Sequence, residues 1–81
     1  MYYVYILKSL KIPTKIYIGF TSDLGKRLAE HASAGKNNYT YRHAPWKLET
    51  YAMFNNALKA KAFEAYLKTG SGRTFLKNHL I

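Results

Sequence analysis

Two tyrosines, a glycine and an arginine stand close together in the first third of this 81-residue chain. Tyr5 is followed by Tyr17 and Gly19, and Arg27 comes ten residues after Tyr17. A phenol donates and accepts hydrogen bonds, and a guanidinium binds the oxygens of a phosphate through a fork of N–H groups. This set of groups suits chemistry on a phosphodiester better than on a small neutral metabolite.

The net charge of the chain indicates a polyanionic partner. Thirteen lysines and arginines stand against four aspartates and glutamates, which gives a formal net charge of +9. Such an excess attracts nucleic acid, because binding releases counterions from the phosphate backbone. The alternatives are a basic ribosome-associated or membrane-surface protein, and basicity kept for solubility. A divalent metal ion would find few carboxylate ligands, namely Asp23, Glu30, Glu49 and Glu64.

Length and composition limit the class of protein. A chain of this size, with 48% hydrophobic and 16% aromatic residues, is expected to form one domain over residues 1–81, near the lower limit for a single core. It has no cysteine, so neither a disulfide nor a thiolate zinc site stabilises it. The apolar run at residues 2–7 is too short for a signal peptide, and no segment approaches the roughly 20 apolar residues of a membrane span. We expect a cytoplasmic protein that does not associate with membranes.

Two segments near the N-terminus predict a β-hairpin. Residues 2–8 and 15–21 are rich in aromatic and β-branched side chains, and Pro13 marks the turn between them. Because side chains alternate between the faces of a strand, the two faces differ in character. The aliphatic face comprises Val4, Ile6, Ile16, Ile18 and Phe20, and the opposite face comprises Tyr3, Tyr5, Tyr17 and Gly19. We interpret the aliphatic face as the core and the tyrosine face as the working surface. Gly19 is expected to be a glycine because a Cβ there would crowd the neighbouring phenols or an approaching phosphate.

A helix is expected directly after the hairpin. Thr21-Ser22-Asp23 is a cluster of N-cap residues, and Gly35 ends a helical pattern over about residues 24–34. Arg27 and His31 are four residues apart, which places them on the same side of this helix, at the border of its apolar stripe.

The second half of the chain predicts one strand and two helices. Residues 46–54 alternate in character, and Asn55-Asn56 caps a helix that extends to about residue 69. Gly70-Ser71-Gly72 breaks the chain before a short terminal helix. The predicted order is β-β-α-β-α-α, an α/β (α+β) fold with a small three-stranded antiparallel sheet flanked by helices.

In order and spacing, these motifs resemble the GIY-YIG nuclease superfamily. The resemblance is to the short stand-alone bacterial type, related to the N-terminal cleavage module of the excision-repair incision protein. Tyr3-Val4-Tyr5 takes the place of the first triplet, Tyr17-Ile18-Gly19 is the second, Arg27 matches the helical arginine and Glu64 the metal-binding glutamate. The resemblance covers essentially the whole chain, including the ending Gly70-Ser71-Gly72-Arg73.

The resemblance implies a metal-dependent endonuclease that hydrolyses DNA phosphodiester bonds, structure- or damage-directed, in DNA repair or processing. Glu64 would hold one Mg²⁺ or Mn²⁺ ion, whose other ligands would be substrate phosphate and water. The alternative for Glu64 is a helix-surface glutamate paired with Lys61 or Lys68. The alternative for the whole chain is a non-catalytic nucleic-acid-binding module on the same scaffold. We expect a monomer or a weak homodimer, with RNA as an open alternative to DNA.

The resemblance also places Tyr5 and Tyr17 near the attacked phosphate, where one of them would help to deprotonate the nucleophilic water. An unperturbed phenol has a pKa of about 10, so a nearby cation must lower that pKa or another group must take up the proton. Arg27 would serve there and would stabilise transition-state charge, and its alternative is a surface ion pair with Glu30. His31 would relay a proton or bind phosphate, and its alternative is a structural role beside the apolar stripe.

A further set of cations and aromatic residues is expected to contact nucleic acid, as such mixtures do on nucleic-acid-binding surfaces. The set is Lys26, Lys36, Tyr39, Arg42 and Arg73. The alternative for the segment 36–42 is a solvated loop whose tyrosines fold back on the sheet. One departure from the family pattern is Phe20, where repair-type modules carry a lysine, so that Lys15 or Lys26 would have to supply that cation.

Overall fold

The central strand of the sheet is β1 (Tyr2–Ser9), in a computed structural model that describes residues 1–32 and 42–81. It pairs antiparallel with β2 (Ile16–Thr21) on one side and with β3 (Trp46–Phe54) on the other. The two outer strands are therefore the edges of a three-stranded antiparallel sheet.

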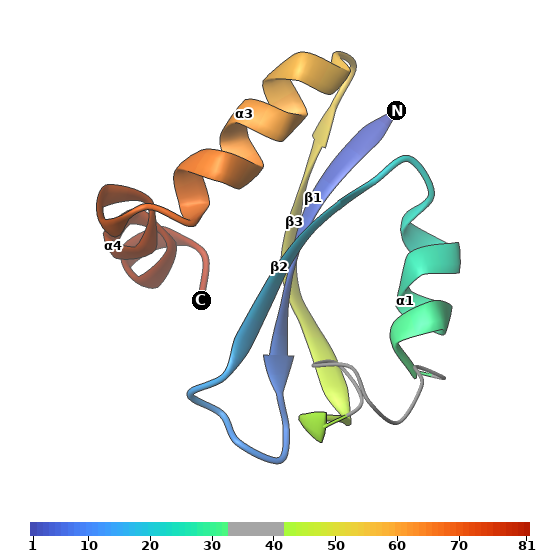
Figure 1. Ribbon diagram of the computed structural model, residues 1–81, viewed down its shortest axis with the longest axis vertical. Helices are drawn as coiled ribbons and strands as arrows, with labels where there is room; N and C mark the ends of the chain where they lie inside the picture. Colours follow the sequence, from blue (N-terminus) through green and yellow to red (C-terminus); the bar gives the residue numbers. More distant parts are fainter. Residues whose placement is uncertain (33–41) are drawn as a thin grey trace.

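Helices cover both faces of this sheet (Figure 1). α1 (Leu24–Ala32) lies on one face, and α3 (Ala57–Leu67) and α4 (Gly70–His79) lie on the other. The element order β-β-α-β-α-α and the antiparallel sheet confirm the fold predicted from the sequence. Within the described ranges, none of the helices is long and apolar enough to cross a membrane.

The aliphatic face of the hairpin forms the hydrophobic core, as the alternation of its side chains predicts. Its buried residues pack against α3 and α4 in one cluster of Val4, Ile6, Ile18, Ala60, Leu67 and Leu76. Burying each large aliphatic side chain contributes about 1.5–3 kcal/mol to the free energy of unfolding, so this face accounts for much of the stability.

α1 and α3 begin at the caps that the sequence predicts. Asp23 Oδ1 accepts a hydrogen bond from the backbone N–H of Lys26 at 3.1 Å at the start of α1. Asn56 Oδ1 accepts one from the N–H of Lys59 at 3.1 Å at the start of α3. Each cap satisfies a backbone donor that the first helical turn leaves without a partner. The predicted end of the first helix at Gly35 lies outside the described residues.

The prediction that Gly70-Ser71-Gly72 breaks the chain before the last helix is wrong. α4 begins at Gly70 itself, and the break between the helices falls at Lys68 and Thr69. Thr69 is the N-cap, and its Oγ1 accepts a hydrogen bond from the N–H of Gly72 at 3.1 Å. Both glycines therefore belong to the first turn of α4.

Gly72 is required by packing rather than by flexibility. It is buried where α4 starts against the end of α3, and a Cβ there would overlap the carbonyl group of Tyr66 and crowd the Cα of Leu67. These are backbone atoms, which cannot turn aside as a side chain can. The close approach of the two helices thus depends on a missing methyl group.

Gly72→Ala should lower the free energy of unfolding by about 2–3 kcal/mol, the scale of overpacking in a close-packed interior. Gly70→Ala is the matched control, because nothing lies within 4 Å of the Cβ that it adds. Replacing a helical glycine by alanine then stabilises the protein by up to about 1 kcal/mol. Urea unfolding of the two variants measures both effects, and equal stability of the two would contradict this account of Gly72.

Candidate active site

Three ring side chains meet on the tyrosine face of the sheet, under α1. They are Tyr5 of β1, Tyr17 of β2 and His31 of α1, which we call the Tyr–His cluster. The ring centroids lie 6.2 Å apart for the two tyrosines, 5.7 Å for Tyr5 and His31, and 4.7 Å for Tyr17 and His31. A hydrogen bond of 2.8 Å joins Tyr5 Oη to His31 Nε2. Residues from three different elements thus meet in one cluster, within which a hydrogen bond joins Tyr5 to His31.

Gly19 makes room for this arrangement. It lies directly opposite Tyr5 in the antiparallel register, and a Cβ at this position would overlap the phenol ring and hydroxyl of Tyr5. None of the described glycines has a positive φ, so space rather than backbone conformation requires the glycine. The sequence-based reason for this glycine, that a Cβ would crowd a neighbouring phenol, is confirmed.

Burial determines the protonation of Tyr5. Its side chain is 1% exposed, and burial raises its pKa well above the ordinary value for a phenol. The neighbouring Tyr17 raises the pKa further, while the positive charge of Arg27 acts in the opposite direction. Tyr5 therefore keeps its proton at neutral pH, so it is able to donate a hydrogen bond and is not a phenolate base.

His31 has the complementary property. Burial lowers its pKa from the model-peptide value of 6.5, Arg27 lowers it further, and Glu30 partly offsets both effects. The imidazole is therefore neutral at neutral pH. A neutral imidazole that accepts the Tyr5 proton through Nε2 carries its own proton on Nδ1. Of these two groups, His31 is the one able to take up a further proton.

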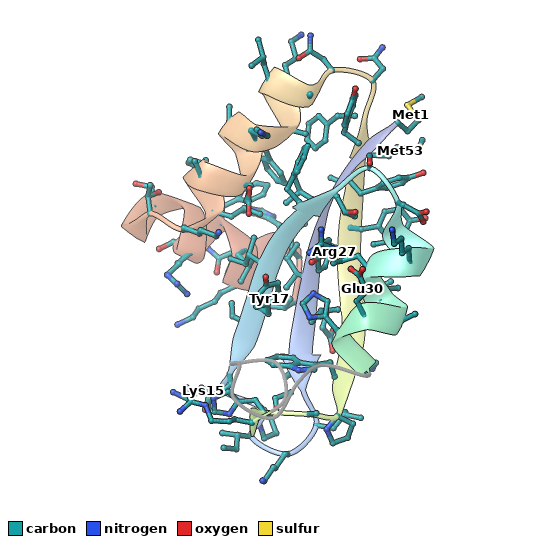
Figure 2. The ribbon with its side chains drawn as sticks, turned by 45° about the vertical axis from the view of Figure 1, so that its right-hand side comes forward. Met1, Lys15, Tyr17, Arg27, Glu30 and Met53 are labelled. Carbon is teal, nitrogen blue, oxygen red and sulfur yellow. The ribbon has the colours of Figure 1, made fainter. Side chains whose placement is uncertain are left out.

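The raised pKa of Tyr5 changes the role expected for Arg27. The sequence suggests that its guanidinium lowers the pKa of a catalytic phenol, but at Tyr5 the effect of burial is larger. Arg27 Nε lies 3.3 Å from Glu30 Oε1, and both side chains are about half exposed, 45% and 52%. In Figure 2 the two side chains extend from α1 toward the strands, on the side where Tyr17 lies. Because an exposed ion pair is worth about 0–1 kcal/mol, a phosphate could displace Glu30 at little cost.

Glu64 acts on the same cluster from α3. Its negative charge is one of the causes of the raised pKa of Tyr5. The carboxylate lies 3.1 Å from the Lys68 ammonium, with side chains 23% and 50% exposed respectively. Of the two partners that the sequence allows, Lys68 is therefore the one that the fold selects.

The described residues around Glu64 could hold a hard divalent cation only if phosphate and water supplied its other ligands. Among the described residues, no group of three or more histidines, cysteines, aspartates or glutamates gathers in one place. The carboxylate nevertheless holds a cation already, the ammonium of Lys68. A magnesium-type ion with one protein carboxylate takes its remaining ligands from phosphate and water, and Glu64 offers such a site.

Phe20 points away from the Tyr–His cluster. It belongs to the aliphatic side of the hairpin, where it stacks on Tyr2 with centroids 6.0 Å apart. The ammonium of Lys61 lies 5.3 Å from the centroid of its ring. The cation beside Phe20 is thus Lys61, which the sequence suggested only as a possible partner of Glu64. Lys15 lies at the far end of β2 (Figure 2).

The residues expected to contact nucleic acid are spread over several elements. Lys26 is exposed beside Arg27 on α1, where both border one shallow pocket. Arg73 borders a second open pocket, together with Tyr17 and Lys68. Arg42 is exposed and borders a third, with Lys11. Lys36 and Tyr39 lie outside the described residues, and so does most of the segment 36–42.

Comparison with known proteins gives one matching family model and several similar bacterial proteins. The model of one protein family, described as the GIY-YIG catalytic domain, matches residues 1–78. The chain is 37% identical over 68 residues to a UPF0213 protein of Clostridium perfringens, an alignment that covers 84% of this chain and 71% of the relative. It is 36% identical over 84 aligned positions to the UPF0213 protein YsiG of Lactococcus lactis, covering 99% and 79%. A UPF0213 protein of Streptococcus pyogenes is 33% identical over 72 residues, covering 89% and 76%.

The lowered pKa of His31 makes stability depend on pH. Because the unfolded chain binds this proton more tightly than the folded protein, the free energy of unfolding falls as the pH drops through and below about 6.5. His31→Gln should flatten that decline in urea unfolding measured from pH 7.5 to 5. His79→Gln, at an exposed position on α4, is the control. His43, whose pKa is also lowered by desolvation and nearby cations, is present in both variants and cancels. An unchanged decline in His31→Gln would contradict the burial of a neutral imidazole.

Proposed function

Because this chain belongs to the GIY-YIG family of catalytic domains, we propose that it is a nuclease that cleaves DNA phosphodiester bonds with the help of one Mg²⁺ or Mn²⁺ ion. Its cleavage is directed by the structure of the DNA or by damage to it, in DNA repair or processing. The observation that carries the proposal is the hydrogen bond between Tyr5 and His31. The ring of Tyr17 packs against His31, and the charges of Arg27 and Glu64 both affect the pKa of Tyr5.

Exposure separates the two tyrosines. Tyr5 is almost completely buried, so its hydroxyl is held against His31 and does not reach the solvent. Tyr17 lies on the edge strand and is less buried. We therefore assign Tyr17 as the phenol that contacts the phosphate or the attacking water. Tyr5 is a positioning residue, which holds the imidazole of His31 in place and sets its tautomer.

The remaining groups divide the proton transfer and the charge stabilisation between them. His31 is neutral at neutral pH, so its unprotonated ring nitrogen, and not a phenolate, takes up the proton of the nucleophilic water, directly or through the hydroxyl of Tyr17. Arg27 leaves Glu30 and binds the phosphate oxygens, where its charge stabilises the additional negative charge of the transition state. Glu64 holds the metal ion, which supplies positive charge to the leaving oxygen when it is bound.

The size and charge of the protein favour the selection of substrates by the shape of the nucleic acid rather than by its base sequence. A net charge of +9 attracts any nucleic-acid backbone. Contacts with phosphates fix the position of the protein on the nucleic acid but carry no information on base sequence. The proposed enzyme thus selects accessible or distorted strands.

The first test is nicking of supercoiled plasmid and of flapped or branched oligonucleotides in Mg²⁺, Mn²⁺ or EDTA. Metal-dependent cleavage is expected, and Glu64→Ala and Arg27→Ala should each lower its rate at least about 100-fold, the scale for removing a group that stabilises transition-state charge. Glu49→Ala is the matched control, because its carboxylate pairs with Lys47 on β3. Tight, salt-sensitive binding without cleavage in any metal would favour the non-catalytic binding module instead.

The second test separates the tyrosines. Tyr17→Phe should lower the cleavage rate by about 100-fold, the loss expected for a group that takes part in proton transfer. Tyr5→Phe should have a smaller effect on rate but should raise the pKa of His31, measured by NMR titration, because the donor that favours the neutral imidazole is lost. An equal loss of rate in both variants, with the pKa of His31 unchanged, would show that Tyr5 itself contacts the substrate.

A further inference from the structure

An open pocket lies against β2 on the side away from α1. It is bordered by Ile16, Tyr17 and Ile18 of the strand, by Lys68 after the end of α3, and by Arg73 of α4. Tyr17 thus belongs both to the Tyr–His cluster and to this pocket. Among the described residues, the side chain of Arg73 forms no ion pair, so its charge is available to an anion from outside.

Lys68 stands between two places where its ammonium can lie. It now pairs with Glu64 at 3.1 Å, and it also borders the pocket. The side chain is 50% exposed and ends a flexible four-carbon stem. A short rotation of that stem moves the charge from the carboxylate to the pocket without a change in the backbone.

We propose that this pocket binds the phosphodiester next to the one that is cleaved, and that Lys68 enters it when a divalent cation takes its place on Glu64. This inference rests on the proposed function, because it uses Glu64 as the metal ligand. The shared position of Tyr17 supports the assignment: Tyr17 borders the pocket together with Lys68 and Arg73, so a strand whose reacting phosphate lies at Tyr17 has this pocket beside it for the neighbouring phosphate. Both cations recognise backbone phosphate and not bases, so the subsite accepts any sequence.

Electrostatics couples the two events. An ammonium and a divalent cation repel each other, so both cannot remain on the single carboxylate of Glu64. The displaced Lys68 then adds its charge to that of Arg73 in the pocket. Metal binding therefore strengthens phosphate binding, and phosphate binding strengthens metal binding by the same factor. An ordinary pair of helix-surface residues would produce neither effect.

The metal arm of the test is Mn²⁺ binding by calorimetry in the absence of nucleic acid. Lys68→Met should bind Mn²⁺ about 3–10-fold more tightly than the wild type, because the competing ammonium is gone. Lys77→Met, which removes an exposed charge from α4, should match the wild type. If Glu64→Gln loses the ion but Lys68→Met binds Mn²⁺ no more tightly than the wild type, the exchange of Lys68 is wrong. The proposed function is not affected by that result.

The phosphate arm is binding of a short single-stranded oligonucleotide with non-hydrolysable linkages, with and without Mn²⁺. Mn²⁺ should increase the affinity of the wild type, and Lys68→Met and Arg73→Met should lower the affinity in Mn²⁺ about 3–10-fold. Each should also reduce the slope of log K against log salt by about 0.7. Affinities equal to that of Lys77→Met would overturn the subsite.

The two levels of the proposal fail differently. If Glu64→Gln binds Mn²⁺ as well as the wild type does, the metal ligand of the proposed function is wrong, and the exchange of Lys68 is overturned with it. If Glu64→Gln loses the ion but Lys68→Met behaves like Lys77→Met in both arms, only the further inference is wrong.

Discussion

The contact between the Tyr5 ring and Gly19 is the constraint on which the site depends. The ring fits over the sheet only because its partner across the strands has no side chain. In that position its hydroxyl reaches His31, and this hydrogen bond joins α1 to the sheet. Arg27 is on the same helix, one turn earlier, so its charge is positioned by the same contact. A single missing Cβ therefore places residues from three elements in one site.

The sheet separates stability from chemistry. One face is filled by aliphatic side chains that pack on α3 and α4, and the other carries the Tyr–His cluster under α1 (Figure 1). The two sides are connected at β2, which is an edge strand. Tyr17 lies there between the cluster and the pocket of Lys68 and Arg73. An edge strand leaves room for a substrate to approach both sides of the sheet at once.

Every carboxylate of the chain has a local role. Asp23 caps α1, and the three glutamates each pair with a nearby cation: Glu30 with Arg27, Glu49 with Lys47, and Glu64 with Lys68. These pairs are partly or largely exposed, so each contributes little to stability and opens easily. Two of them hold the residues that the proposed chemistry needs. In the proposed mechanism, these partners are exchanged: phosphate replaces Glu30 on Arg27, and the metal ion replaces Lys68 on Glu64.

The local features of the protein could be read from the sequence alone. The alternation along residues 2–8 and 15–21 assigned the core face correctly, and Asn56 was recognised as a cap. The reason for Gly19 could also be stated in advance. These features depend on neighbours along the chain or across one hairpin, where the geometry of a strand or a helix turn is fixed.

The tertiary structure decided the protonation states and the partners. The spacing along α3 allowed Lys61 or Lys68 to pair with Glu64, and packing placed Lys61 over Phe20 and Lys68 on the carboxylate. The sequence suggested that a nearby cation lowers the pKa of a catalytic phenol. The pKa of Tyr5 is instead raised, because the effect of burial is larger than that of the charge of Arg27. Position 72 requires a glycine because the end of α3 packs directly against it. Such properties depend on the solvent that neighbouring elements exclude and the atoms that they bring into contact, and residue spacing along the chain contains neither.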